Sequence, residues 1–220
     1  GVTDYLTTGF VAKTEGISTN ITIACWVRVD DSSATQTWLW NFYQDTANGW
    51  GLQVGATSGM FNIKDDTNST DALVYNDIPA NNDTWYRVIV VLDDAEQKIY
   101  VNGSLEGSGT DILVGTGLDD FTSTLYIGDR KGDGTGCWAG KMSDFQLWDT
   151  AWSAADVTYD YLNPESLALN RGGTSLTNSN LKLWYPMQDG HRGQQSYILD
   201  GANTGLGSEL ISEGDFSGAD

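Results

Sequence analysis

The chain has 220 residues, among them 26 glycines, 9 tryptophans and 10 tyrosines, and its formal net charge at pH 7 is −19. Nucleic acids and anionic lipids attract basic surfaces, so this charge excludes a nucleic-acid partner and disfavours an anionic membrane surface. The sequence contains no run of about 18 apolar residues, so we expect no membrane insertion.

Apolar and polar residues alternate along much of the chain, a period typical of β-strands. In Ile21–Val29 every odd position is apolar, which predicts a strand with one face against a core. Further strands are predicted at residues 37–42, 50–54, 59–64, 85–92, 98–101, 125–128, 141–148 and 181–187. Asn102-Gly103 favours a tight hairpin turn. Frequent strands separated by turns indicate an all-β fold, namely a two-sheet antiparallel jelly-roll sandwich.

One short helix is predicted after these strands. Ser153 and Asp156 have the spacing of a capping box, in which each side chain bonds the backbone of the other residue. Asn163-Pro164 ends the helix because proline cannot continue it. The apolar side chains expected to face the sandwich are Val157, Tyr161 and Leu162.

The composition changes towards the C-terminus. We interpret residues 1–190 as one domain and residues 191–220, which are rich in glycine and serine, as a tail. Cys25 and Cys137 are the only cysteines, and their wide separation indicates neither a zinc site nor a redox pair. Two interpretations of them remain open: two buried thiols, or a disulfide between strands, which a secreted location would favour.

Four stretches of sequence carry a resemblance to a known family. They are IACWVR (23–28); TWYRV (84–88) with IYVNG (99–103); LYIG (125–128) with WAGKMSDFQLW (138–148); and AWS (151–153) with DV (156–157). Their order and spacing resemble the laminin G-like jelly-roll domain of the concanavalin A-like lectin/glucanase superfamily, as found in phage and bacterial surface proteins. Family members often have aspartate where this chain has Ser143, and Asp144 is the neighbouring acid here.

The same superfamily contains glycoside hydrolases and polysaccharide lyases, so catalysis is an alternative to binding. A retaining hydrolase needs two carboxylates about 5–5.5 Å apart. The resemblance implies that a hydrolase of this superfamily would carry them in an E-x-D-x-x-E motif, and this motif does not occur in the chain. The only histidine is His191, in the predicted tail, which also removes a Ser-His-Asp triad and the base of a lyase. We therefore predict a protein that is not an enzyme, with a hydrolase or lyase as the less favoured alternative.

The resemblance also implies a calcium site, because laminin G-like and pentraxin-like domains commonly bind Ca²⁺ through oxygen ligands. Two acid-rich loops and one strand acid supply the candidates, although none has EF-hand spacing, and a solvated turn residue is the alternative interpretation of each. The candidate ligands are Asp65, Asp66, Asp129, Asp133 and Asp144.

A sugar site would combine exposed aromatic rings with polar side chains that bond hydroxyl groups. The aromatic residues nearest predicted turns are Trp38, Trp40, Tyr43, Trp50 and Trp138. We select Trp138, Tyr43, Trp50 and Trp40 as candidate ligand-binding residues, although most tryptophans in such a sandwich belong to the core. Trp138 and Tyr43, which adjoin polar loops, are the two expected to be exposed.

Two functions are consistent with these patterns. The first is a non-catalytic carbohydrate-binding or adhesion module of a secreted, cell-surface or virion-surface protein, whose partner is a glycan. The second is a structural subunit of a phage fibre, capsid decoration or extracellular filament, whose partner is another protein. A homo-oligomer is compatible with either.

Overall fold

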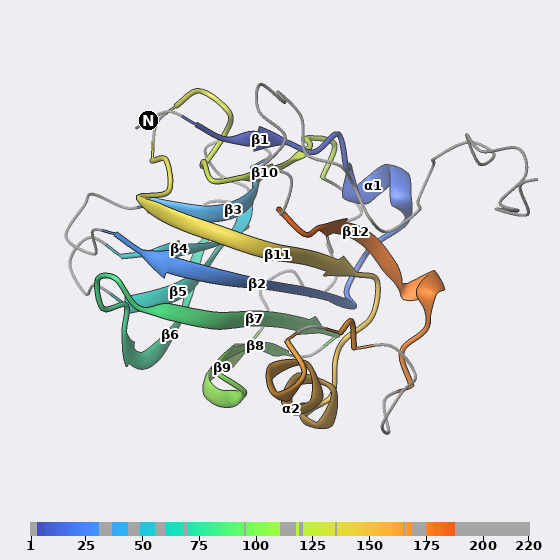
Figure 1. Ribbon diagram of the computed structural model, residues 1–220. Helices are drawn as coiled ribbons and strands as arrows, with labels where there is room; N and C mark the ends of the chain where they lie inside the picture. Colours follow the sequence, from blue (N-terminus) through green and yellow to red (C-terminus); the bar gives the residue numbers. More distant parts are fainter. Residues whose placement is uncertain are drawn as a thin grey trace, which may run out of the picture.

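The computed structural model describes residues 4–30, 37–43, 49–55, 60–67, 70–94, 96–110, 118, 121–134, 136–164, 166–168 and 175–187. These residues form two six-stranded antiparallel sheets that face each other (Figure 1). Sheet A has the order β1 (Leu6–Thr7), β10 (Leu125–Ile127), β3 (Thr37–Tyr43), β4 (Gly49–Val54), β5 (Met60–Thr67), β6 (Thr70–Pro79). Sheet B has the order β12 (Leu181–Tyr185), β11 (Gly140–Trp148), β2 (Ile21–Val29), β7 (Trp85–Asp93), β8 (Glu96–Val101), β9 (Ser104–Thr110). The architecture confirms the predicted antiparallel jelly-roll sandwich.

The main core lies between the two sheets and follows the alternation of the strands. Successive side chains point to opposite faces of a strand, so the odd positions of β2 all face sheet A. Sheet A contributes large aromatic side chains to the same core, and removing apolar surface from water stabilises the fold by about 25 cal/mol per Å². The core residues of β2 and of strands β3 to β5 include Ile21, Ile23, Cys25, Val27, Val29, Trp40, Phe42, Trp50, Leu52, Phe61 and Ile63.

Among the described residues, three strands and one α-helix have no counterpart among the predicted elements. They are β1, β6, β9 and α1 (Ala12–Glu15). Strand β9 has the sequence SLEGSGT, which lacks apolar alternation, and it joins sheet B only through its pairing with β8. Strands β1, β6 and β9 lie at sheet edges, where backbone pairing on one side can hold a strand that has little apolar pattern of its own.

Helix α2 (Ala154–Leu162) begins with the predicted capping box. The Ser153 hydroxyl accepts from the Asp156 backbone N–H at 3.2 Å, and the Asp156 carboxylate accepts from the Ser153 N–H at 2.8 Å. Val157 is buried as predicted. Tyr161 is partly buried against Trp26, with ring centroids 6.2 Å apart. The prediction for Leu162 is wrong, because this last residue of the helix is 68% exposed.

The Asn102-Gly103 turn joins β8 to β9 as predicted. Both residues have positive φ, 51° and 83°, which is the geometry of the two-residue hairpins that Asn-Gly favours. Glycine is also required by space, since a Cβ at Gly103 would lie 2.8 Å from the ring of Tyr161. The turn therefore lets helix α2 lie close against this end of sheet B.

Within the described residues, no helix has both the length and the apolar character needed to cross a lipid bilayer.

The two cysteines are free thiols, Cys25 buried in the core and Cys137 partly buried. Burial raises the pKa of Cys25 to about 12. Burial also raises the pKa of Cys137, and the nearby Asp129 carboxylate, which accepts a hydrogen bond from this thiol, adds to the rise.

We expect a maleimide at pH 8 to modify Cys137 slowly in the native protein and Cys25 only after unfolding, because the thiolate is the reacting form. Peptide mass spectrometry distinguishes the two sites, and the chain unfolded in guanidinium should label at both. Equal labelling rates of Cys25 and Cys137 in the native state would contradict the burial of Cys25.

The raised pKa of Cys25 also makes the stability of the fold depend on pH. The stability that the neutral Cys25 thiol contributes is complete below pH 9 and is lost as the pH rises towards 12.

Candidate functional site

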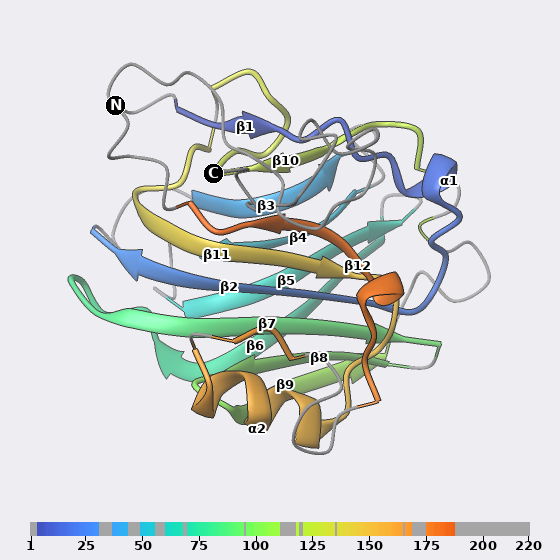
Figure 2. The ribbon, with the colours of Figure 1, turned by 45° about the vertical axis from the view of Figure 1, so that its right-hand side comes forward.

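The two sheets differ in what covers their outer faces. Helix α2 lies beside β8 and β9 at one end of sheet B (Figure 2), and a second apolar cluster forms on the outer face of this sheet. This cluster contains Ala24, Ile89, Val91, Tyr100, Trp148, Trp152, Val157, Ala168, Leu176 and Leu181. The outer face of sheet A carries polar side chains and has no such cluster among the described residues. The candidate functional site therefore lies on sheet A.

A β-bulge determines which aromatic ring of β3 faces outward. Simple alternation would place Trp38, Trp40 and Phe42 on one face of the strand. The register between β3 and β4 shifts between Trp38 and Trp40, so Trp40 pairs with Leu52 of the core, whereas Trp38 pairs with Gln53 of the outer face. Bulges re-aim side chains in this way. Trp38 thus joins the outer face and Trp40 the core.

Strand register places the outward side chains of β3, β4 and β5 in rows. Gln53 lies between Trp38 and Asn62, and Gly51 lies between Asn41 and Lys64. Gly51 leaves room for its neighbours, since a Cβ there would lie 2.6 Å from Asn41 Oδ1 and 2.8 Å from the Trp38 ring. The Trp38 ring therefore covers Gly51.

The polar members of these rows are almost completely buried. Asn41, Gln53 and Asn62 are 2%, 3% and 1% exposed. Gln53 Nε2 donates to Asn62 Oδ1 at 2.8 Å. The side-chain oxygens of Asn41 and Gln53 have no hydrogen-bond partner. Since most buried polar atoms in folded proteins are satisfied, two orphan acceptors on the same face of neighbouring strands indicate a missing donor.

The Asp129 loop (residues 129–134) folds over this face. The Asp129 carboxylate is buried and accepts hydrogen bonds from the backbone N–H groups of Arg130 at 2.7 Å and Gly134 at 3.1 Å. The Tyr5 hydroxyl donates to the Gly132 carbonyl at 2.6 Å, and Asn41 Nδ2 donates to the Arg130 carbonyl at 2.9 Å. These contacts fix the backbone of the loop, and with it the origin of the Arg130 side chain.

Arg130 lies against two aromatic rings of the outer face. Its guanidinium carbon is 5.7 Å from the centroid of Trp38 and 5.6 Å from that of Tyr43, both within cation–π range. Trp38 is buried, whereas Tyr43 and Arg130 are partly exposed. Arg130 Nε has no hydrogen-bond partner. We call Trp38, Asn41, Tyr43, Gln53 and Arg130 the sheet A site.

The acids predicted to bind calcium do not come together in the described part of the chain. The Asp129 carboxylate is occupied by its own loop, Asp133 forms an ion pair with Lys131 at 2.8 Å, and Asp144 lies on the other sheet. Among the residues that the structure describes, no three acidic, histidine or cysteine side chains form a metal-binding group. The side chains of Asp65 and Asp66 lie outside the description, as does His191.

The aromatic residues predicted to bind a ligand occupy two environments. Trp40 and Trp50 are fully buried in the core with ring centroids 4.8 Å apart, and Trp50 Nε1 donates to Gln97 Oε1 at 2.9 Å. Both rings point into the core between the sheets, so they cannot contact a ligand on the outer face of sheet A. Trp138 is partly exposed near the start of β11, where its ring covers Gly140. Of the four selected residues, Tyr43 belongs to the sheet A site.

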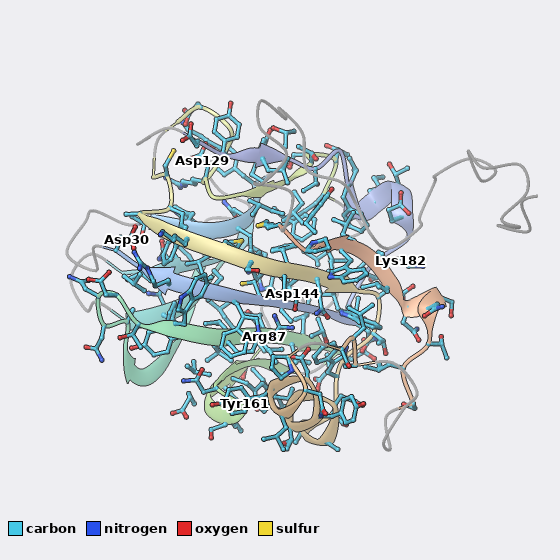
Figure 3. The ribbon with its side chains drawn as sticks, in the orientation of Figure 1. Asp30, Arg87, Asp129, Asp144, Tyr161 and Lys182 are labelled. Atoms are coloured by element: carbon cyan, nitrogen blue, oxygen red, sulfur yellow. The ribbon has the colours of Figure 1, made fainter. Side chains whose placement is uncertain are left out.

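Asp144 is part of a buried charged network on the outer side of sheet B (Figure 3). Arg87 binds Asp160 of α2 through Nε at 2.7 Å and Nη2 at 2.8 Å, and binds Asp144 through Nη1 at 3.0 Å. Burial alone would lower the pKa of the Arg87 guanidinium, but the two carboxylates hold it above its ordinary value. Trp184 Nε1 of β12 donates to Asp144 at 2.8 Å. The network joins α2, β11, β7 and β12, so its role is structural.

Sequence reasoning missed most of the sheet A site. The polar residues of the outer face alternate with core residues along their strands, and this pattern by itself predicts only a solvent-exposed face. They are Asn41, Gln53 and Asn62. The loop that contains Arg130 is rich in acids, and this pattern predicts a calcium site instead of a role for its arginine. The pair of glycines in Gly49-Trp50-Gly51 was the available signal, since it removes side chains from one face of a central strand.

A family model described as "Concanavalin A-like lectin/glucanases superfamily" matches residues 1–158. The chain belongs to this superfamily. The resemblance drawn from the sequence is thereby confirmed. The superfamily match ends before β12, yet Leu181–Tyr185 pairs with β11 and completes sheet B. No curated protein matches the chain in sequence.

Several solved structures resemble this member of the superfamily. The native heptameric SAP-like pentraxin from Limulus polyphemus has a TM-score of 0.53 at 20% identity, covering 66% of this chain and 70% of that one. A putative carbohydrate-binding protein from Bacteroides ovatus has a TM-score of 0.58 at 18% identity, covering 90% of this chain and 53% of that one. The Ruminococcus gnavus sialidase CBM40, bound to sialyllactose, has a TM-score of 0.54 at 15% identity, covering 67% and 85%. At these identities the similarity establishes the fold alone.

Proposed function

We propose that the chain is a non-catalytic carbohydrate-binding domain whose glycan binds at the sheet A site. The observation that carries the proposal is the set of unpartnered polar atoms there: the side-chain oxygens of Asn41 and Gln53, and Arg130 Nε. A buried polar atom without a partner costs about 1–3 kcal/mol. A sugar hydroxyl both donates and accepts hydrogen bonds, so a glycan that displaces the covering Trp38 ring or Arg130 side chain can satisfy acceptors and a donor in one place.

The aromatic residues of the site support the same ligand class. Tyr43 is partly exposed at the end of β3 and adjoins Arg130. Aromatic rings present an apolar face on which the C–H face of a pyranose can stack. That the domain is non-catalytic is inferred from the sequence. It lacks the E-x-D-x-x-E motif of the hydrolases, and His191 is its only histidine. The Bacteroides and Ruminococcus structures, named as a putative carbohydrate-binding protein and as a module bound to sialyllactose, are consistent with this class of ligand.

Three expectations from the sequence remain predictions. A secreted, cell-surface or virion-surface location, a homo-oligomer and calcium dependence all await measurement. By backbone register Asp66 pairs with Gly49, which in turn pairs with Tyr43, so Asp66 occupies a strand position in line with Tyr43 of the sheet A site. Comparing glycan binding in CaCl₂ and in EDTA tests that part of the proposal.

The test is a glycan array followed by titration calorimetry on the glycans that bind. We expect Tyr43→Ala to weaken binding at least about tenfold, which corresponds to 1.4 kcal/mol. The matched control is Trp85→Ala, which removes a 44% exposed ring from sheet B and should leave affinity unchanged. A broad array with no bound glycan, or Tyr43→Ala binding as tightly as the wild type, would contradict the proposal.

A second pair of variants tests whether the glycan binds next to Gly51, the residue of β4 that the Trp38 ring covers. Gly51→Ala forces a methyl group against Asn41 and Trp38, whereas at Gly49 the nearest atom to a Cβ, the Phe42 carbonyl oxygen, is 3.4 Å away. Both changes are made on one strand, but a Cβ at Gly51 would also lie 2.6 Å from the Trp40 carbonyl oxygen, so the stability of each variant is measured beside its affinity. We expect Gly51→Ala to weaken glycan binding more than Gly49→Ala does, at temperatures where circular dichroism shows both variants folded. Equal affinities would place the glycan elsewhere.

A further inference from the structure

Arg130 differs from most other basic residues in the described part of the chain, because it is partly buried and has no carboxylate partner there. The protein has 30 acidic and 11 basic residues, so carboxylates are available in excess to pair with any cation. Other lysines and arginines of the described residues form ion pairs with them: Arg28 with Asp30, Arg87 with Asp160, Lys98 with Asp93, Lys131 with Asp133 and Lys182 with Asp149. No described carboxylate lies within ion-pair distance of Arg130.

The surroundings of Arg130 only partly compensate for this missing charge. The rings of Trp38 and Tyr43 attract the guanidinium through their negative faces. Neither ring can accept the in-plane hydrogen bonds of a guanidinium, and Nε is buried without a partner. A partly buried arginine held in this way is preorganised for an anion, because little side-chain freedom remains to be lost on binding.

The neighbouring groups define the kind of anion. A guanidinium matches a carboxylate through two parallel N–H···O bonds, and the flanking rings favour a flat group. The orphan oxygens of Asn41 and Gln53 are acceptors, so they would repel an anion and bind a hydroxyl donor. The site thus offers a carboxylate partner beside hydroxyl partners. We propose that the ligand is an acidic sugar, whose carboxylate binds Arg130 and whose hydroxyl groups bind Asn41 and Gln53.

This inference rests on the proposed glycan-binding function and narrows its ligand class. The test uses acidic sugars with neutral counterparts: trigalacturonate with its methyl ester, and sialyllactose with lactose. At least one acid should bind ten times more tightly than its counterpart. Arg130→Gln should abolish that difference and leave the weaker binding of the neutral sugar. Arg130→Lys, which keeps the charge without the planar fork, should retain part of it.

The matched control is Lys131→Gln, the adjacent cation, whose ammonium already pairs with Asp133 at 2.8 Å. We expect this variant to keep the preference for the acid. Equal binding of acidic and neutral sugars, with Tyr43→Ala still weakening both at least about tenfold, would overturn the inference and leave the proposed function standing. Binding of glucose 6-phosphate but of neither acid would overturn it in favour of a phosphate ligand. If no sugar of any kind binds, both proposals fail.

Discussion

Replacing Arg87 with methionine is expected to lower the free energy of unfolding by about 3–5 kcal/mol. The variant would leave Asp160 buried, and Asp144 partly buried, without the cation that both carboxylates share. An uncompensated buried charge is far more costly than the pair is stabilising, because its desolvation is no longer offset. Since Asp160 belongs to α2, the helix should loosen from sheet B together with the loss of stability.

Urea denaturation followed by tryptophan fluorescence measures this change. The matched control is Arg28→Met on the neighbouring strand, because Arg28 also pairs with two aspartates, Asp30 at 2.6 Å and Asp83 at 3.3 Å. Those pairs are solvent-exposed and should contribute less than about 1 kcal/mol. Similar losses in the two variants would show that Arg87 is not the buried centre of a network. Retained glycan binding by folded Arg87→Met is also expected, since the sheet A site lies on the opposite sheet.

Trp50→Ala should cost about 3–5 kcal/mol, the loss typical of removing a large aromatic side chain from a core. Trp50 is fully buried, lies between Trp40 and Phe42, and donates to Gln97. Trp50→Phe should cost less, but it removes the buried hydrogen bond that Trp50 Nε1 donates to Gln97, a loss of about 1–3 kcal/mol. Adding Gln97→Leu to Trp50→Phe should recover part of that loss.

Thermal unfolding of these variants is compared with that of Trp85→Ala, in which an exposed ring is removed at an expected cost of about 0.5 kcal/mol. The comparison also separates a core residue from a ligand contact. A Trp50→Ala protein that kept its melting temperature but lost glycan binding would mean that Trp50 faces a ligand, as the sequence suggested.

The fold was largely predictable because it depends on a pattern that the sequence displays directly. Alternating apolar residues predicted β2 over the bounds that the structure shows, and the capping box and the Asn102-Gly103 hairpin were predicted from local chemistry. Edge strands such as β9 were not predictable in this way. Their stability comes from backbone pairing with a neighbour, which leaves no mark on the side-chain pattern.

The candidate site was less predictable because bulges and long-range contacts create it. The bulge in β3 sends Trp38 outward and Trp40 inward, a reversal that alternation does not foresee. Asp144 sits at a second register shift, in β11, with a φ of 50°, and meets Arg87 from β7 and Trp184 from β12. Such partners are distant in sequence, so an acid taken singly could not be assigned to a metal or to an ion pair.

The position of β2 inside sheet B has a consequence for the order of folding during synthesis. Thr22 of this strand pairs with Val91 on one side and with Trp148 on the other. A ribosome therefore releases the apolar strand β2 long before either neighbour exists, and β12 closes the edge of the same sheet last of all. Contacts of such high sequence separation slow folding and prolong the exposure of unpaired strands. The nascent chain should depend on its acidic charge, or on a chaperone, to remain soluble until residue 185 has emerged.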